Sequence, residues 1–465
     1  MSEHLNDTAC RRESVIIPPD QHPVREEDID QDALMVLYRL KDAGYSGYLV
    51  GGGVRDLYLG KKPKDFDIST DARPGQLRKL FRNSRTIGRR FRLVQVFFRD
   101  NKIIEVSTLR SQSEYDEDGG PDEVLPSNNT FGTLEEDACR RDLTINSLFY
   151  EVEHKTVIDY VGGVQDLQDR IIRLVGDPDR RITRDPVRML RAVRHAARAG
   201  FKIEEATWQA IIRHRDKLEL CPTSRIRDEL LKDLQGGASR AWAELTLQSG
   251  LFHLLFPFYE ELLTGSQGET VKQEMLALLG VADRLIHEGR KLGKISLDEA
   301  LLFALPLQPW VKRRFSLSQE DIKGAGHHQT VKAVRAALDK AFSRRLNLTK
   351  MTLENITTLV VNSPVFQKGA MPAGLRRKSY FAACSRFAAC CREAEGGEPA
   401  DLSMFAITAE PQKQASRPAP SAQKAIFLSP QSNGKKNGGG YSPAFSSRPE
   451  GVFGLRREGR NLTLS

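Results

Sequence analysis

The sequence predicts an α+β protein, in which a head with a mixed or antiparallel sheet is followed by all-helical neck and body domains. Two observations support this fold class. Short β-type runs alternate with turns and brief helices from about residue 48 to residue 175, and helical periodicity dominates afterwards. With 465 residues the chain is too long for one compact core, so several domains are expected.

Strands are expected where short runs rich in β-branched and aromatic residues are bounded by turn residues. These runs are residues 48–50, 65–69, 93–98, 102–108, 148–152, 156–161 and 171–175. Apolar residues at helical spacing predict a helix from Ala33 to Ala43 before the first strand, with Gly44 as its C-terminal stop.

The second half of the chain reads as helical. Asp185 is expected to be the N-cap of a helix that has Pro186 at its first position and ends at Gly200. Further helices are predicted by apolar periodicity at 226–234, 241–258, 270–292, 297–305, 329–342 and 381–394.

These patterns divide the chain into five parts. They are a flexible N-terminal arm (1–28), the head (29–175), a helical neck (176–265), an arginine-rich helical region (266–395) and a basic tail (396–465). The tail is dense in Pro, Ser, Gly and Lys, and it is expected to be disordered because it cannot bury enough apolar surface to offset its ordering entropy.

Charge and cysteine usage narrow the class of protein. The formal net charge of +9 favours a polyanionic partner, although a solvated basic surface is the alternative. Six scattered cysteines without a C-x-x-C pair are expected to be reduced thiols of a cytoplasmic protein, with neither a zinc site nor a disulfide framework. No run reaches the roughly 18 apolar residues of a membrane span, and the polar N-terminus does not resemble a signal peptide.

The most informative pair of residues is Asp65 and Asp67. On a strand, a spacing of two places both carboxylates on one face, with Phe66 and Ile68 packing behind them. Neighbouring carboxylates repel unless a cation lies between them. Such oxygen ligands suit Mg²⁺, and a pair of them can bridge the two ions of an in-line phosphoryl transfer. The alternative is a turn or a solvated strand edge.

A glycine turn precedes this pair. Gly51, Gly52 and Gly53 follow the strand at 48–50 and open a short helix, so the backbone can approach a ligand and direct N–H groups at it. The segment is neither a Walker A loop nor a G-x-G-x-x-G turn. The alternative is a tight connection without a ligand.

Four motifs occur in a fixed order: GGGVRD (51–56), DFDIST (65–70), RRDLTINSL (140–148) and DPVRMLRAVR (185–194). In this array the chain resembles the class II nucleotidyltransferases, which comprise bacterial poly(A) polymerases and CCA-adding tRNA nucleotidyltransferases. The resemblance implies addition of AMP from ATP to RNA 3′ ends without a template. It also implies two Mg²⁺ ions, or Mn²⁺ in their place, and mRNA, small RNA or tRNA as the acceptor.

The resemblance implies three catalytic carboxylates, Asp65, Asp67 and Asp142. Asp65 and Asp67 would bind metal together with Glu105, whose alternative is an ordinary exposed strand residue. Asp142 would lie near the ribose and favour ribonucleotides.

The resemblance also implies a set of nucleotide-binding residues: Gly52, Arg55, Arg141, Asn146, Asp185, Arg188, Arg191 and Arg194. Gly52 and Arg55 would hold the triphosphate. Asp185 and Arg188, at i and i+3 of a helix, would present an acceptor and a donor fork that imitate the Watson–Crick edge of a partner base. Arg184 departs from the family pattern, because many relatives carry Glu there.

The four motifs do not distinguish the poly(A) polymerase branch of the family from the tRNA nucleotidyltransferase branch. IGRRFRLVQV (87–96) resembles a segment of the polymerase branch, and so do the basic clusters at 312–314, 344–345 and 376–378, which would bind RNA backbone. SRIRDEL (224–230) resembles a neck motif of both branches. A tRNA nucleotidyltransferase is therefore the alternative, and a non-catalytic RNA-binding protein is a more remote one.

Overall fold

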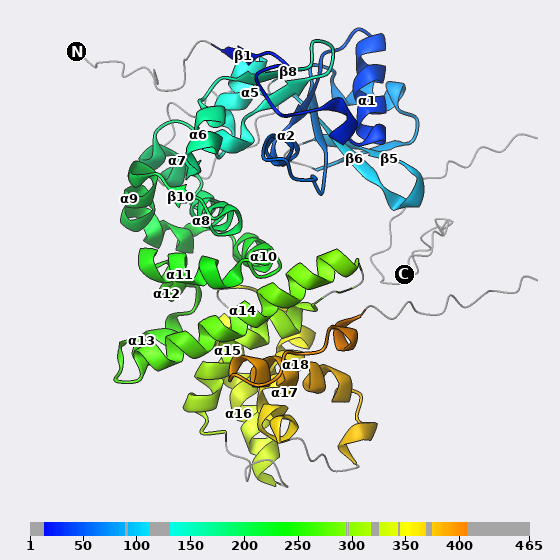
Figure 1. Cartoon of the computed structure of the whole chain (residues 1–465). Coiled ribbons are helices and arrows are strands. Elements are labelled where there is room, and N and C mark those ends of the chain that lie inside the picture. The colour runs from blue at the N-terminus through cyan, green and yellow to red at the C-terminus, as the bar shows by residue number, and fades with distance from the viewer. Residues whose placement is uncertain are drawn as a thin grey trace, which may run out of the picture. The chain divides into compact units, whose positions relative to one another are not determined.

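The computed structural model describes residues 14–88, 92–111, 131–293, 295, 297–317, 325–342, 345–368 and 374–406 (Figure 1). By their contacts, all of these residues belong to one unit, Met1–Thr408. Parts of four predicted segments lie outside the described residues: residues 1–13 of the arm, Arg89–Phe91 of the arginine-rich run, Arg344 of the basic cluster 344–345, and the tail from residue 407.

The head contains an eight-stranded sheet in the order β1-β8-β7-β2-β3-β6-β5-β4. The strands are β1 Val15–Ile17, β2 Gly47–Val50, β3 Asp67–Thr70, β4 Ser84–Ile87, β5 Leu93–Phe97, β6 Ile103–Thr108, β7 Phe149–Glu151 and β8 Thr156–Asp159. Within this sheet only β3 and β6 pair in parallel, and the other described pairs are antiparallel. The predicted α+β class and mixed sheet are confirmed.

The helices of the head are α1 Gln31–Asp42, α2 Gly52–Tyr58, α3 Pro74–Leu80, α5 Leu134–Arg140 and α6 Gly163–Asp169, with 3₁₀ turns η1 Glu26–Asp28, η2 Arg99–Asn101 and η3 Thr144–Asn146. Strand β1 falls in the segment predicted to be a flexible arm. Val15–Ile17 pair with β8, and Ile17 is buried, so the ordered head begins earlier than the sequence indicates.

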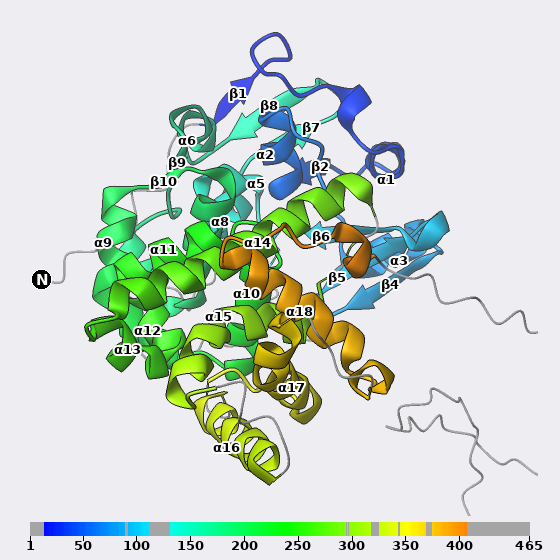
Figure 2. The ribbon, with the colours of Figure 1, turned by 60° about the horizontal axis from the view of Figure 1, so that its bottom comes forward.

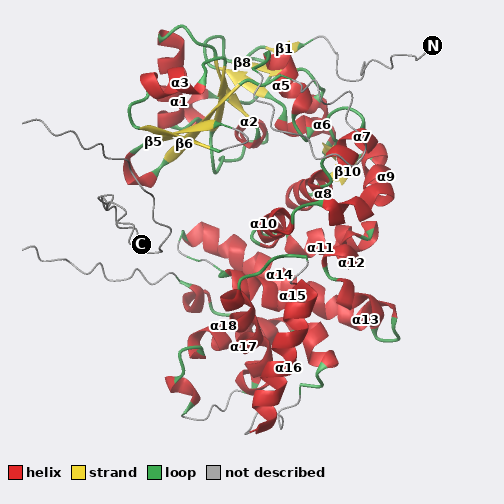
Figure 3. Ribbon diagram, turned by 180° about the vertical axis from the view of Figure 1, so that it is seen from behind, coloured by secondary structure: helices red, strands yellow, loops and turns green. Residues whose placement is uncertain are grey.

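Almost everything after the head is helical, as Figure 3 shows. The neck contains α7 Pro178–Arg184, α8 Val187–Ala199, α9 Glu205–His214, η4 Arg215–Leu220, α10 Thr223–Leu234, α11 Ser239–Ser249, α12 Leu251–Leu255, η5 Pro257–Tyr259 and α13 Glu260–Thr264. A short parallel pair joins β9 Ile171–Ile172 to β10 Lys202–Ile203. The predicted helix 241–258 is divided at Gly250, whose φ of 79° interrupts the helical conformation.

The C-terminal region contains α14 Gly268–Leu292, α15 Glu299–Arg314, α16 Ala325–Phe342, α17 Lys350–Gln367, η6 Leu375–Arg377, α18 Phe381–Ala394 and η7 Leu402–Phe405. Helices α17 and α18 pack side by side, and α14 contacts both α15 and α18 (Figure 2). Described residues extend into the predicted tail as far as 406, and Ala400 and Phe405 are buried.

Helix α15 continues through two prolines. It was expected to stop near Leu305, yet it extends to Arg314 past Pro306 and Pro309. The hydroxyl of Tyr259 lies between the turns, donating to the Pro306 carbonyl (2.5 Å) and accepting from the Trp310 N–H (3.3 Å). A buried side chain therefore bonds two backbone groups of the turn that contains Pro309.

Four cysteines, Cys221, Cys384, Cys390 and Cys391, are free and buried, in agreement with the expected reduced thiols. Cys139 instead takes part in a disulfide, which the scattered cysteine pattern did not predict. Within the described ranges, none of the helices has the length and apolar character needed to cross a bilayer.

Candidate active site

The two carboxylates that follow the glycine turn lie where the strand begins. Asp67 is the first residue of β3, and Asp65 precedes it by two residues. Both side chains are exposed, whereas Phe66 and Ile68 between and after them are buried in the core. The exposure alternates as the D-x-D spacing predicts, but Asp65 lies before the strand and not on it.

Glu105 lies directly opposite Asp67, because β3 and β6 run parallel in this register. Gln95 of β5 is the next residue in the same row and donates to Glu105 Oε1 (3.0 Å). Burial raises the pKa of Asp67 to about 6, and the charges of Glu105 and Asp65 add to the rise, while Arg141 opposes it. The side chain of Asp67 reaches solvent through the open pocket, and the walls of the pocket enclose it on the other sides. The site therefore gathers like charges at one point.

Such a gathering fits a divalent cation, which would relieve the repulsion. Among the described residues, no group of three or more His, Cys, Asp or Glu is arranged to hold a metal ion. The chain alone thus offers an incomplete set of ligands. That agrees with the way Mg²⁺ is usually bound in phosphoryl-transfer sites, by one or two carboxylates with water and substrate phosphates completing the shell.

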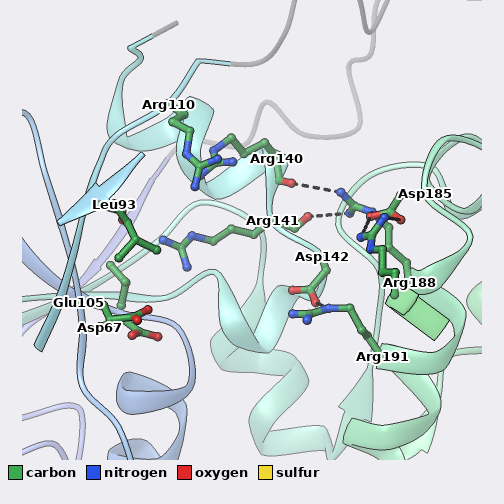
Figure 4. Close-up of a pocket in the computed structure, with 13 residues that line it drawn as sticks. Asp67, Leu93, Glu105, Arg110, Arg140, Arg141, Asp142, Asp185, Arg188 and Arg191 are labelled. Atoms are coloured by element: carbon green, nitrogen blue, oxygen red, sulfur yellow. Dashed lines mark hydrogen bonds and ion pairs between the residues drawn. The ribbon is translucent and has the colours of Figure 1, made fainter. Parts of the chain in front are cut away.

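Asp67 and Glu105 lie at one end of an open pocket of about 390 Å³ (Figure 4). Arginines dominate the rest of its wall. The charged residues lining the pocket are Asp67, Glu105, Arg110, Arg140, Arg141, Asp142, Asp185, Arg188, Arg191 and Arg225. Asp65 is not among the lining residues, although its charge acts on Asp67. A pocket with carboxylates at one end and six arginines elsewhere suits a polyanion bound through cations and guanidinium groups.

The glycine turn brings the backbone close to this acidic end. Gly51 has a φ of 68°, a conformation that favours glycine. A Cβ atom at Gly51 would lie 3.7 Å from Arg141 Nη1 and 3.9 Å from Asp67 Oδ2. The turn is therefore next to the point where the cationic and anionic parts of the pocket meet.

Arg141 is held in place by a buried carboxylate that the sequence analysis missed. Its Nε and Nη2 donate to Asp137 Oδ2 (3.1 and 2.8 Å), and Arg140 also pairs with Asp137. Burial by itself would raise the pKa of Asp137, but Arg141 and Arg140 hold it below its usual range. The spacing of Asp137 three and four residues before the two arginines, on one helix, was the available signal.

Asp142 is fixed by Arg191 of α8. Arg191 Nε donates to Asp142 Oδ2 (2.5 Å), and the Leu143 backbone N–H donates to Oδ1 (2.9 Å). Burial opposes ionisation of Asp142, yet the charges of Arg191 and Arg188 and the hydrogen bond from Arg191 keep its pKa well below the usual range. The acceptor predicted to face the ribose is therefore charged at neutral pH.

Asp185 and Arg188 both line the pocket, with Arg188 Nε 3.7 Å from Asp185 Oδ2. Asp185 is not the N-cap that was expected: α8 begins at Val187 and its N-cap is Pro186. Arg225 of α10 instead binds both carboxylate oxygens of Asp185, at distances of 2.8 and 2.9 Å. Arg225 is a lining residue that the sequence analysis did not assign, although it lies in the segment 224–230.

Arg188 has a second role. Its guanidinium donates to the backbone carbonyl of Arg141 (3.2 Å), and Arg181 of α7 donates to the carbonyls of Arg140 (2.8 Å) and Arg141. Two arginines of the neck thus bind the last carbonyls of α5, where the negative end of the helix dipole favours cations.

Two of the predicted nucleotide-binding arginines lie away from the pocket wall. Arg55 bonds Asp56 and Asn146 behind the glycine turn. Arg194 is buried and pairs with Glu229 (2.5 Å) and Asp233 (3.0 Å) of α10. The described contacts of Arg194 are those of a structural ion pair between α8 and α10.

Comparisons with known proteins agree with this architecture. Residues 47–173 match the Poly A polymerase head domain, and residues 200–263 match the probable RNA and SrmB-binding site of polymerase A. A solved tRNA nucleotidyltransferase, complexed with a primer tRNA and an incoming ATP analog, is 22% identical, with a TM-score of 0.50. The match covers 78% of this chain and 94% of that one, and it shows the fold alone. The two domain matches and the shared fold make the chain similar to the nucleotidyltransferases.

Curated relatives narrow the family. Poly(A) polymerase I of Escherichia coli O6:H1 is 42% identical over 339 residues, which are 71% of each chain. Poly(A) polymerase I of Salmonella typhi is 47% identical over 303 residues, and this chain spans 63% of its length. A CCA-adding enzyme of Bacillus subtilis is 38% identical over 285 residues, 60% of this chain and 67% of that enzyme. The chain belongs to the poly(A) polymerase family, as its motifs predicted.

Proposed function

We propose that the protein adds AMP from ATP to the 3′ end of RNA without a template. The observation that carries the proposal is the position of Asp67 opposite Glu105, at one end of a pocket whose lining also includes six arginines. Relatives named poly(A) polymerase I support ATP as the nucleotide and poly(A) as the product. The consequence for the cell would be polyadenylation that promotes RNA turnover.

Asp65, Asp67 and Glu105 are the residues proposed to hold two Mg²⁺ ions, or Mn²⁺. Metal bound there would neutralise charge on the triphosphate and lower the pKa of the attacking RNA 3′-hydroxyl. Arg141, which faces Asp67 across Gly51, is positioned for phosphate oxygens. Asp142, held ionised by Arg191, is proposed to accept from the ribose 2′-hydroxyl.

Selection of adenine is assigned to the far end of the pocket. Asp185 supplies acceptor oxygens, and Arg188 and Arg225 supply planar donor forks, so the three side chains offer the kinds of group that a partner base would offer. No base of a template is needed, because α8 carries Arg188, α10 carries Arg225, and Asp185 lies between α7 and α8.

RNA backbone contacts are proposed for the C-terminal region, and the structure narrows the predicted basic clusters. Arg313 is paired with Glu274 and Arg345 with Glu219, so both side chains have internal partners. Arg376, Arg377 and Lys378 at η6 are exposed. This cluster is the better candidate for phosphates, and binding through it would weaken as salt rises.

The test offers ATP, CTP, GTP and UTP separately, with Mg²⁺, to oligo(A), to tRNA lacking its CCA end and to tRNA ending in CC. Long tracts made from ATP alone on generic RNA are expected. The addition of one to three nucleotides confined to tRNA would instead favour the tRNA nucleotidyltransferase alternative, which the CCA-adding relatives keep open. No incorporation with any substrate would contradict the proposal.

A further inference from the structure

His195 connects two parts of the candidate site that lie on different elements. It is half-buried on α8, seven residues after Arg188 and four after Arg191, so the three side chains follow one side of the helix. Unlike Arg188 and Arg191, His195 does not line the pocket. It faces the segment behind the glycine turn instead.

The contacts of the ring define its protonation state. Arg55 Nη1 lies 3.3 Å from His195 Nδ1, and Asn146 Nδ2 lies 3.5 Å from Nε2. Because a guanidinium can only donate, Nδ1 must be the unprotonated nitrogen of a neutral ring. The proton is then on Nε2, so the approach of the Asn146 amide nitrogen, itself a donor, is not a hydrogen bond. Enclosure by protein and the charge of Arg55 both lower the pKa of His195, in agreement with a neutral ring.

Arg55 in turn lies directly behind the turn. A Cβ atom at Gly52 would be 3.3 Å from Arg55 Nη2. The guanidinium is fixed from three directions, by Asp56 at Nε and Nη2 (2.9 and 2.7 Å), by Asn146 Oδ1 at Nη1 (2.7 Å) and by His195 at Nη1. Among these groups His195 is the one that comes from α8.

From these contacts we propose that His195 is a positioning residue: its neutral Nδ1 holds Arg55 against the glycine turn and so ties the triphosphate end of the site to the base-reading helix. The distance along α8 from Arg188 to His195 is about 10 Å at about 1.5 Å per residue, so one rigid helix reaches both ends of the bound nucleotide. The inference rests on the proposed function, since it assumes that a nucleoside triphosphate binds here.

Three substitutions separate this role from simple packing. His195→Phe keeps a planar ring of similar size without the acceptor. His195→Asn places an amide oxygen near the former Nδ1, and His195→Gln carries its oxygen further out, toward the former Nε2. We expect His195→Phe and His195→Gln to raise the KM for ATP, and the Kd for ATP measured without RNA, by about 10-fold or more, because a hydrogen bond to a charged donor is lost. The kcat should stay within about 3-fold, and His195→Asn should restore KM to within about 3-fold of the wild type.

Thermal unfolding of each variant is recorded first. If His195→Phe does not fold, the KM for ATP of His195→Gln is compared with that of His195→Asn instead. If His195→Phe or His195→Gln folds but has an unchanged KM for ATP, and the wild type is active, the inference about His195 is wrong while the proposed function stands. A rise in KM that His195→Asn fails to reverse would also overturn the inference alone. A wild type that neither binds ATP nor extends RNA would overturn the proposed function, and the inference with it.

Discussion

Asp67 lies directly opposite Glu105 across β3 and β6, the only parallel pair described in the main sheet. The two residues are far apart in sequence, yet the register sets them side by side at the acidic end of the pocket. Burial raises the pKa of Asp67 to about 6, and the charges of Glu105 and Asp65 add to the rise. A site that is electrostatically unfavourable when empty is typical of functional residues, since a bound ligand relieves the repulsion.

The first prediction concerns pH. Because the folded pKa of Asp67 is raised to about 6, its ionised form dominates above that pH and is lost as pH falls through it. We expect kcat/KM for AMP addition with Mg²⁺ to fall by up to about 10-fold per pH unit below 6, since a protonated carboxyl is a poor metal ligand. Single-turnover assays from pH 5 to 8 measure this. A profile that stays flat down to pH 5 would contradict the assignment of Asp67.

The second prediction concerns stability. A carboxyl whose folded pKa lies above its unfolded value destabilises the fold above that pKa, and the penalty disappears as pH falls below the unfolded value. Asp67→Asn should therefore raise Tm at pH 7.5 and leave it unchanged near pH 4. Because Asp67 is exposed, screening limits the gain to about 1 kcal/mol, or a few degrees.

The change in Tm on addition of Mg²⁺ provides a control for this experiment. Addition of Mg²⁺ should raise the Tm of the wild type more than that of Asp67→Asn, because a ligand that binds the native state stabilises it. Asp216→Asn, at an exposed carboxylate with only a weak contact to Arg215, should respond to Mg²⁺ as the wild type does. Equal responses in all three proteins would argue against a metal at Asp67.

The third prediction concerns Arg194. Its side chain pairs with Glu229 and Asp233 of α10, and burial raises the pKa of Asp233 to about 7 even with Arg194 present. Arg194→Met would leave two buried carboxyls without their cation, so we expect a loss of about 3–5 kcal/mol in the free energy of unfolding. The KM for ATP of the folded protein should change by less than about 3-fold.

A matched control for Arg194 is Arg240→Ala, which removes an exposed partner of Glu244 and should cost less than about 1 kcal/mol. Chemical denaturation and steady-state kinetics check both variants. If Arg194→Met were as stable as the wild type but bound ATP weakly, Arg194 would be a nucleotide-binding residue, as the family resemblance implies, and not a structural one.

The fourth prediction concerns nucleotide choice. Arg225 grips both oxygens of Asp185, so Arg225→Ala would free that carboxylate to move. We expect the ratio of kcat/KM for ATP to that for CTP to fall by about 10-fold or more, since a bidentate contact contributes about 1–3 kcal/mol to discrimination. Arg227→Ala on the same helix serves as the control and should keep the ratio, because Arg227 bonds Asp228 and the Asn347 carbonyl and not Asp185. Selectivity unchanged in Arg225→Ala would remove Arg225 from the base-reading set.

The sequence anticipated what depends on local spacing. Exposed Asp65 and Asp67 with buried Phe66 and Ile68 follow from a period of two, and the short strands of the head follow from runs of β-branched and aromatic residues. Helix α17 was missed because its polar and apolar residues are not separated onto opposite faces and it contains Pro364, so it shows no one-sided periodicity.

The spacing of residues in the sequence cannot show which side chain of another element a residue contacts. Periodicity on α8 places Arg191 and Arg194 within one turn of each other, but it does not say that α10 covers Arg194 while Asp142 receives Arg191. Arg225 was missed as a site residue for the same reason, because its target Asp185 lies 40 positions earlier and on another element. Likewise, Tyr259 stabilises α15 through a contact that no local pattern reveals.

The most direct measurement is incorporation of labelled AMP into oligo(A) by the wild type, Asp67→Asn and Asp216→Asn, at equal concentrations and pH 7.5 with Mg²⁺. Circular dichroism first confirms that all three proteins are folded. The wild type and Asp216→Asn are expected to extend the primer, and Asp67→Asn to lose at least about 1,000-fold in rate, a loss of about 4 kcal/mol of transition-state stabilisation. Extension by Asp67→Asn at the wild-type rate would contradict the account.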